Sequence, residues 1–164
     1  MTDTNPSIMV VDDDWMIREI MQAHLENAGY TVYTAHSGEN ALELAAIHLP
    51  DLVILDMRMP GLNGHDVCAR LKTASATRNT AVLITTAMDD EESRRRAVEA
   101  GADDFLAKPF DAVVMLTRVK SLLRIKFLQD ELERRDQQLR DVLIRHVGEA
   151  TARLILADLL AETP

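Results

Sequence analysis

The sequence predicts an α/β domain with a doubly wound, five-stranded parallel sheet, followed by an extended C-terminal helix. The strand candidates are short apolar runs, and the stretches between them have helical spacing. Continuous apolar runs suit strands that are buried on both faces of a parallel sheet. Alternation of strands with helices indicates βαβ units with right-handed crossovers. The long helix is predicted because residues 111–147 contain neither Gly nor Pro.

Five segments are predicted to be strands. Residues 30–35 are rich in β-forming residues and follow Gly29, whereas the other four candidates are continuous apolar runs that end at polar or charged residues. These four are residues 7–11 before Asp12, 52–55 before Asp56, 81–84 before Thr85 and Thr86, and 105–107 before Lys108.

Four helices are predicted between the strands. The apolar residues that mark them are Ile17, Ile20, Met21 and Leu25 in the first, residues 41–49 in the second, Val67 and Leu71 in the third, and Ala97, Val98 and Ala100 in the fourth. Gly29 and Gly101 stand where the first and fourth helices should end, and Pro50 follows the second.

The C-terminal helix is too long for one small domain. A helix over residues 111–147 would reach roughly 55 Å at 1.5 Å per residue, so we expect its distal half to project. We divide the chain into a globular domain over 1–125, a coiled-coil-like helix over 126–147, and a short helix or a linker to a further domain over 148–164. Apolar residues at heptad a and d positions predict a parallel homodimer seam that Arg135 weakens; a helix folded back on its own domain is the alternative. The seam positions are Ile125, Leu128, Leu132, Arg135, Leu139 and Val142.

Composition and charge narrow the possible functions. Hydrophobic residues make up 47% of the chain and charged residues 27%, which is typical of a globular protein. Residues 1–110 carry 18 acidic and 9 basic side chains, whereas residues 111–164 carry 9 of each. Neither part has the basic bias of a nucleic-acid binder. The single cysteine, Cys68, is predicted to be a packing residue, and one cysteine without a disulfide partner is typical of a reducing compartment. No apolar run is long enough to span a bilayer. We therefore expect a cytoplasmic protein.

Polar side chains follow four of the five predicted strands. They are Asp12 with Asp13, Asp56, Thr86 and Lys108. In an open parallel sheet, ligands bind outside the carboxyl ends of the strands, so these side chains should converge. Crowded carboxylates require a hard cation, and oxygen ligands favour Mg²⁺. A carboxylate neutralised in this way can attack phosphorus as a nucleophile, with Lys108 and Thr86 available for the phosphoryl oxygens.

Several motifs resemble the receiver domain of two-component response regulators. They are residues 9–14 (MVVDDD), 52–61 (LVILDMRMPG), 85–87 (TTA) and 108–110 (KPF), and the resemblance covers about residues 6–125. It implies a flavodoxin-like fold in which Asp56 is the phospho-acceptor for a sensor histidine kinase or a phosphotransfer protein. It also implies that Asp13 and Asp56 bind Mg²⁺ directly, that Asp12 binds it through water, and that the backbone carbonyl of Arg58 completes the protein ligands.

The resemblance also implies a conformational switch. Thr86 would move toward the phosphoryl group, Phe105 would turn inward behind it, and Lys108–Pro109 would be a cis peptide bond. Phe105 stands where other regulators carry tyrosine, which excludes a phenolic hydrogen bond. The helix over 126–147 would transmit the signal.

Some assignments have a competing interpretation. Asp14 is expected to cap the first helix, and Thr85 to be buried in the sheet without a functional role. The five histidines are scattered, so none is expected to be catalytic. Arg94, Arg95 and Arg96 are expected to form a solvated face with local ion pairs, the alternative being a partner contact.

Two alternative functions are open for the whole chain. A haloacid-dehalogenase-like phosphatase needs a second Asp two positions after the nucleophile, where this chain has Arg58. We therefore expect no turnover enzyme in this chain. The C-terminal segment weakly resembles linkers that precede class III nucleotide cyclases, so the alternative to a phosphorelay regulator is the sensory part of such an enzyme.

Overall fold

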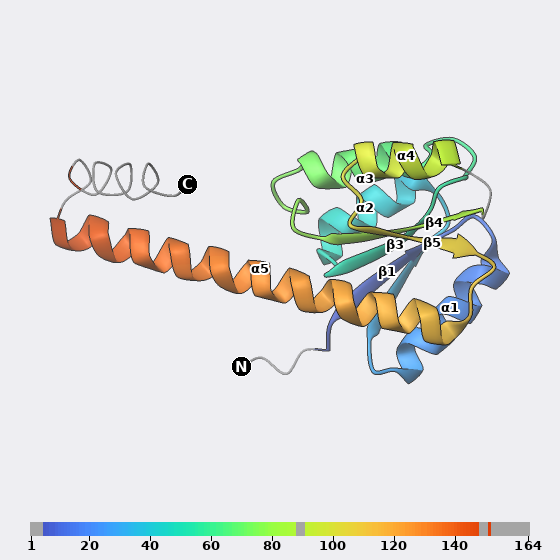
Figure 1. The fold of residues 1–164 in the computed structure, drawn as a ribbon, viewed down its shortest axis with the longest axis horizontal. Coiled ribbons are helices and arrows are strands. Elements are labelled where there is room, and N and C mark those ends of the chain that lie inside the picture. Colours follow the sequence, from blue (N-terminus) through green and yellow to red (C-terminus); the bar gives the residue numbers. More distant parts are fainter. Residues whose placement is uncertain (1–4, 88–90, 148–150, 152–164) are drawn as a thin grey trace. The chain divides into compact units, whose positions relative to one another are not determined.

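Five strands and five helices alternate along the described part of the chain (Figure 1). The computed structural model describes residues 5–87, 91–147 and 151. The strands are β1 (Ser7–Val11), β2 (Thr31–Ala35), β3 (Leu52–Asp56), β4 (Ala81–Ala87) and β5 (Asp104–Lys108). The helices are α1 (Trp15–Asn27), α2 (Gly38–His48), α3 (Gly64–Thr73), α4 (Glu91–Glu99) and α5 (Ala112–Val147). All strand pairs are parallel in the order β2-β1-β3-β4-β5, which confirms the predicted doubly wound sheet.

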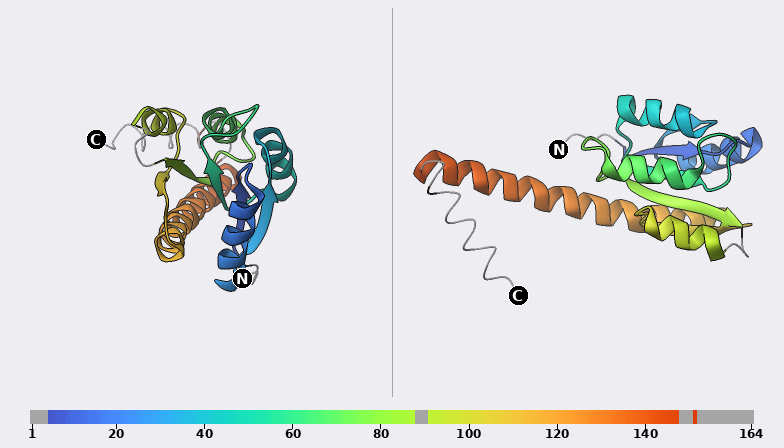
Figure 2. Two further views of the ribbon diagram at one scale, coloured as in Figure 1. Left: turned by 90° about the vertical axis from the view of Figure 1, so that its right-hand side faces the viewer. Right: turned by 90° about the horizontal axis from the view of Figure 1, so that it is seen from above.

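Two apolar layers enclose the sheet. The helices α2, α3 and α4 cover one face, and α1 with the first turns of α5 covers the other (Figures 1 and 2). Successive residues of β1 alternate between the layers: Met9 and Val11 pack under α2 and α3, while Ile8 and Val10 pack under α1 and α5. Because both faces are covered, the inner strands β1, β3 and β4 are buried at nearly every position, and apolar residues fill most of them. This explains why these three strands appear in the sequence as continuous apolar runs, whereas β2, at the edge of the sheet, does not.

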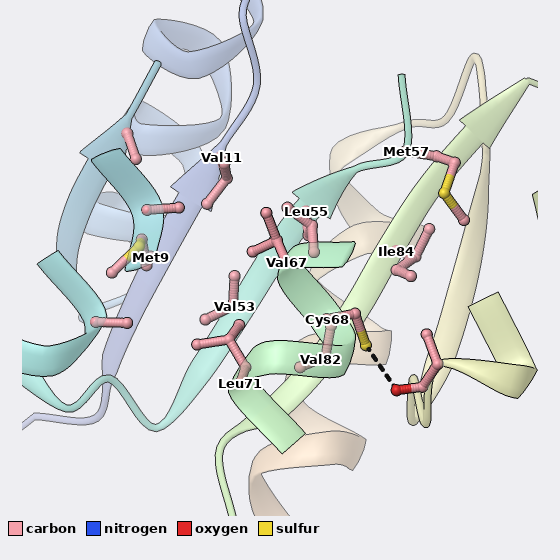
Figure 3. Close-up of a cluster of buried hydrophobic side chains, with 14 of the residues drawn as sticks. Met9, Val11, Val53, Leu55, Met57, Val67, Cys68, Leu71, Val82 and Ile84 are labelled. Carbon is pink, nitrogen blue, oxygen red and sulfur yellow. Dashed lines mark hydrogen bonds between the residues drawn. The ribbon is translucent and has the colours of Figure 1, made fainter. Parts of the chain in front are cut away.

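Cys68 belongs to the first of these layers. Its side chain is fully buried on α3, and its Sγ donates a hydrogen bond of 3.5 Å to the carbonyl of Ala100 (Figure 3). Burial raises the pKa of the thiol to about 11. The prediction of a packing residue is confirmed, since a thiol in this environment has little thiolate character.

Short polar side chains cap the N-termini of α1, α2, α3 and α5. The carboxylate of Asp14 accepts the backbone N–H of Met16 at 2.8 Å, which confirms its predicted role as the cap of α1. Ser37 and Asn63 cap α2 and α3 in the same way. After α1, Gly29 has φ 91°, a left-handed conformation that glycine adopts without strain.

Two of the apolar residues that mark the predicted helices are exposed in the structure, although both helices form as predicted. Ile20 on α1 is 53% exposed, whereas Met21 and Leu25 are buried. Val98 on α4 is 67% exposed, whereas Ala97 and Ala100 are buried. In both cases the helix touches the sheet only along a narrow row of residues three or four apart, and the neighbouring apolar side chain falls outside that row.

The long helix α5 extends over 36 residues. The chain divides into two compact units, residues 1–126 and 127–164, and the backbone of α5 runs from the first into the second. The five apolar side chains of the predicted seam are between 48% and 66% exposed. The predicted short helix or linker over 148–164 lies outside the described residues, Thr151 excepted. None of the helices in the described ranges has both the length and the apolarity needed to span a membrane.

Candidate functional site

The strand register brings the predicted site residues to one edge of the sheet. Asp56 at the end of β3 pairs with Thr85 of β4, and Ala87 of β4 pairs with Lys108 at the end of β5. Asp12 directly follows β1, the other neighbour of β3. The carboxyl ends of β1, β3, β4 and β5 therefore deliver polar groups to one place, at the side where the order of the strands reverses.

Three carboxylates form an acidic cluster at this edge. The side chains of Asp12, Asp13 and Asp56 each offer an oxygen atom, and these atoms all lie within 4.8 Å of one another. Asp12 and Asp56 are buried, at 2% and 7% exposure, while Asp13 is exposed. Such a set of oxygen ligands with one open side is what Mg²⁺ prefers.

Lys108 links two of these carboxylates. Its Nζ lies 2.8 Å from Oδ2 of Asp12 and 2.7 Å from Oδ1 of Asp56. Burial alone would lower the pKa of Lys108, but its hydrogen bonds to the two carboxylates outweigh burial and raise the pKa. Burial raises the pKa of Asp56, and the nearby Lys108 offsets this only in part. Three carboxylates against one ammonium leave the cluster with excess negative charge, which a divalent cation would neutralise.

The loop after β3 holds Asp56 from the other side. The backbone N–H of Arg58 donates to Oδ2 of Asp56 at 3.2 Å. A Cβ on Gly64 would lie 2.3 Å from the Asp56 carbonyl oxygen, so only glycine lets α3 begin this close to the strand end. Asp56, Arg58, Thr86 and Lys108 line one cleft of ≈ 240 Å³.

The two threonines at the end of β4 have different contacts. Thr86 lines the cleft, and its hydroxyl donates to the carbonyl of Ala87 at 3.5 Å. Thr85 is 1% exposed, as predicted, but its hydroxyl donates to Oδ1 of Asp56 at 3.3 Å. The sequence reasoning therefore missed a contact to the central carboxylate. The contact follows from the β3–β4 register, which pairs Asp56 with Thr85, and the sequence near Thr85 carries no signal for that register.

Phe105 lies with its ring directed to the surface. The residue is 37% exposed, and the guanidinium carbon of Arg94 on α4 lies 5.2 Å from the ring centroid. Arg94 also pairs with Glu91 at 3.6 Å, and Arg95 pairs with Glu92 at 2.8 Å. The predicted local ion pairs of this arginine run are confirmed, but the contact of Arg94 with Phe105 was not foreseen.

The Lys108–Pro109 peptide bond is cis, as predicted. Arg58 is exposed at the mouth of the cleft, where the role of its carbonyl as a metal ligand stays a prediction.

Comparisons with known proteins agree on one family. The family described as "Response regulator receiver domain" matches residues 8–120. The response regulator PleD of Caulobacter vibrioides (strain NA1000 / CB15N) is 42% identical over 147 residues, 90% of this chain and 32% of PleD. The response regulator MprA of Mycobacterium ulcerans is 43% identical over 124 residues, 76% of this chain and 53% of MprA. The chain thus spans about a third of PleD and about half of MprA.

A solved structure of the Vibrio cholerae chemotaxis protein CheY4 has a similar fold. Its TM-score is 0.69 at 28% sequence identity, and the match covers 73% of this chain and 99% of that protein.

Proposed function

Because the chain belongs to the receiver-domain family of two-component response regulators, we propose that Asp56 is its phospho-acceptor. The family match supports a role in a phosphorelay and not the alternative reading as the sensory part of a nucleotide cyclase. Receiver domains are phosphorylated by histidine kinases or phosphotransfer proteins, so a protein of this kind is the proposed partner. One observation carries the assignment: Asp56 shares a cleft with Lys108 and is clustered with Asp12 and Asp13.

The proposed chemistry is a phosphoryl transfer between two side chains. A carboxylate oxygen of Asp56 attacks the phosphorus of a phosphohistidine, a new O–P bond forms, and the N–P bond breaks with its electron pair returning to the imidazole nitrogen. Lys108 lies close enough to Asp56 to hold the carboxylate and to stabilise negative charge on the transferring group. Thr86 offers a hydroxyl in the same cleft.

Asp12, Asp13 and Asp56, with the backbone carbonyl of Arg58, would hold Mg²⁺. The fit rests on the all-oxygen donor set and on the excess of three carboxylates over Lys108. The ion supplies charge neutralisation, which allows the buried carboxylate to approach a phosphoryl group.

We expect no turnover enzyme in this part of the chain. A phosphatase of the alternative class needs a carboxylate two positions after the nucleophile to protonate the leaving group, and Arg58 occupies that position. Slow hydrolysis of the phosphorylated aspartate is compatible with this, because water can enter the cleft without a general acid. The net negative charge of residues 1–110 supports a protein partner rather than a nucleic acid.

Thr86 and Phe105 form the proposed switch. In this structure the Thr86 hydroxyl lines the cleft and donates to the carbonyl of Ala87, and Phe105 is exposed, so we expect both side chains to change position when a phosphoryl group is attached. Movement of Thr86 toward the phosphoryl oxygens would vacate space that the Phe105 ring could enter. The surface made by α4, β5 and α5 would then change.

The C-terminal half of α5 is the proposed signalling helix and dimer seam. Its apolar stripe is exposed along residues 125–142, and a second copy of the same stripe would cover it by knobs-into-holes packing. Arg135, at a d position, pairs with Glu131 on its own helix at 2.7 Å. Desolvating this pair in a seam is costly, so the dimer should be weak and sensitive to the state of the receivers.

Sedimentation tests the seam directly. Arg135→Leu should tighten dimerisation and reduce its dependence on beryllofluoride, a phosphoryl mimic, whereas Leu132→Asp with Leu139→Asp should give monomers. A wild-type chain that stays monomeric with and without the mimic, at tens of micromolar (~10 times a micromolar affinity), would remove the seam from the proposal.

Chemical phosphorylation tests the acceptor. Acetyl phosphate with Mg²⁺ should add one phosphoryl group that hydroxylamine removes, and Asp56→Asn should abolish this labelling. Asp66→Asn is the matched control, because Asp66 is a half-exposed carboxylate on α3 outside the acidic cluster. Equal labelling of wild type and Asp56→Asn would overturn the assignment.

A further inference from the structure

Thr85 is a buried hydroxyl that the proposed chemistry does not use. It is 1% exposed on β4, directly beside Asp56 in the strand register. Its hydroxyl donates to Oδ1 of Asp56 at 3.3 Å. A buried hydroxyl normally satisfies its donor with a backbone carbonyl or another side chain; here the acceptor is the central carboxylate.

The two oxygens of Asp56 have different partners. Oδ1 accepts the ammonium of Lys108 at 2.7 Å and the hydroxyl of Thr85 at 3.3 Å. Oδ2 accepts the backbone N–H of Arg58 at 3.2 Å. Two side-chain donors occupy lone pairs of Oδ1, so Oδ2 is the oxygen better able to attack phosphorus. Oδ1 then becomes the carbonyl oxygen of the acyl phosphate.

Phosphorylation changes the charge on Oδ1. In the free carboxylate, Oδ1 carries about half of a negative charge, and this charge is lost when Oδ2 forms its bond to phosphorus. Hydrogen bonds to an ionised acceptor are roughly twice as strong as those to a neutral one. The Thr85 hydroxyl therefore stabilises free Asp56 more than it stabilises phosphorylated Asp56.

The stronger hydrogen bond of Thr85 to charged Oδ1 should also affect the rate at which phosphorylated Asp56 is hydrolysed. A water oxygen attacks phosphorus, the bond between phosphorus and Oδ2 breaks, and its electron pair returns to the Asp56 carboxylate as the leaving group. Charge grows back on Oδ1 in the transition state, where Thr85 can stabilise it. A donor aimed at this oxygen makes Asp56 a better leaving group and a weaker nucleophile.

We propose that Thr85 shortens the lifetime of the phosphorylated state by stabilising the departing carboxylate of Asp56. This role rests on the proposed function of Asp56 as phospho-acceptor. Thr85 acts through Asp56 and not on the phosphoryl group itself, so it is a positioning residue that tunes the stability of the acyl phosphate.

The test compares variants that keep or remove the hydroxyl. Thr85→Val preserves the shape of the side chain and removes the donor, and hydrolysis of the phosphorylated protein should slow about two- to fivefold. Phosphorylation by acetyl phosphate at saturating Mg²⁺ should be as fast as in wild type or faster. Thr85→Ser, which retains the hydroxyl, should restore the wild-type lifetime, and Thr85→Ala repeats the deletion with a smaller side chain should the valine variant fold poorly.

Thr80→Val is the matched control. Thr80 is also a buried threonine, but its hydroxyl donates to the carbonyl of Pro50 at 3.0 Å, before β4 begins and away from the acidic cluster. Its loss removes a buried hydrogen bond without touching Asp56, so the lifetime should not change.

Two results would overturn the proposal. One is an unchanged or shorter lifetime in both Thr85→Val and Thr85→Ala. The other is slower phosphorylation combined with faster hydrolysis, which is the pattern of a disordered site. Failure of the proposed function would look different, because Asp56→Asn would then still become labelled.

Discussion

Replacing Arg94 with methionine should release Phe105 from its exposed position. The guanidinium carbon of Arg94 lies 5.2 Å from the centroid of the Phe105 ring, and the Arg94 side chain is 28% exposed. A cation this close to an aromatic face, in a partly exposed place, contributes about 0.5–1 kcal/mol. In the proposed switch the ring turns inward on phosphorylation and would lose this contact, so the contact should favour the unphosphorylated arrangement by that amount.

This stabilisation can be expressed as an affinity. If the outward state is dominant, weakening it by about 0.5–1 kcal/mol raises the inward population, and hence the apparent affinity for a phosphoryl mimic, about two- to fivefold. Methionine has similar length but no charge. The lost pair with Glu91 adds little, because Glu91 is 90% exposed.

The assay is a titration with beryllofluoride at saturating Mg²⁺, followed through the fluorescence of Trp15, which lies at the start of α1 next to the acidic cluster. Arg95→Met is the control: Arg95 is 65% exposed and pairs with Glu92 and Glu99. The reasoning is refuted if Arg94→Met binds the mimic with wild-type affinity, or if Arg95→Met gains affinity by the same factor.

Three further predictions follow from the site and the core. Mg²⁺ should bind saturably with a change in Trp15 fluorescence, and Asp13→Ala should bind it more weakly; equal affinities would remove Asp13 from the site. Thr86→Ala should still accept a phosphoryl group but lose most of the phosphorylation-dependent protection from hydrogen exchange over residues 91–120, and unchanged protection would count against the switch. Burial raises the pKa of Cys68 to about 11, which lowers the fraction of thiolate at pH 8. Alkylation of Cys68 in the folded protein should therefore be at least about 100-fold slower than in the unfolded chain. The native rate should keep rising up to pH 10, and a plateau below pH 9 would show that the thiol is not perturbed.

The sequence by itself determined the fold and the composition of the site. The continuous apolar runs specify strands buried on both faces, and the helical spacing between them specifies a parallel sheet. Once the sheet is parallel, residues that follow its strands must meet at one edge. Asp12, Asp56 and Lys108 therefore come together without any detailed knowledge of packing. The predictions of the sheet and of the convergence of these residues depend only on the local residue pattern and on the topology, and both can be inferred from the sequence.

The tertiary structure decided which of two neighbouring threonines donates a hydrogen bond to Asp56. Thr85 and Thr86 are adjacent and chemically identical, but successive residues of a strand point to opposite faces. A shift of one residue in the β3–β4 register would exchange them. The register that pairs Asp56 with Thr85 results from packing on both faces of the sheet, not from the sequence near either threonine.

The position of Phe105 depended in the same way on a distant element. Its ring lies under Arg94, which α4 supplies from eleven residues earlier in the chain. Sequence spacing identified the arginine run and its ion pairs with neighbouring glutamates, because those contacts lie within one helix. The orientation of α4 about its own axis buries Ala97 and Ala100 against the sheet. This orientation determines which arginine contacts the aromatic ring. The orientation of α4 is set by packing in the core, so it can be seen only in the folded structure.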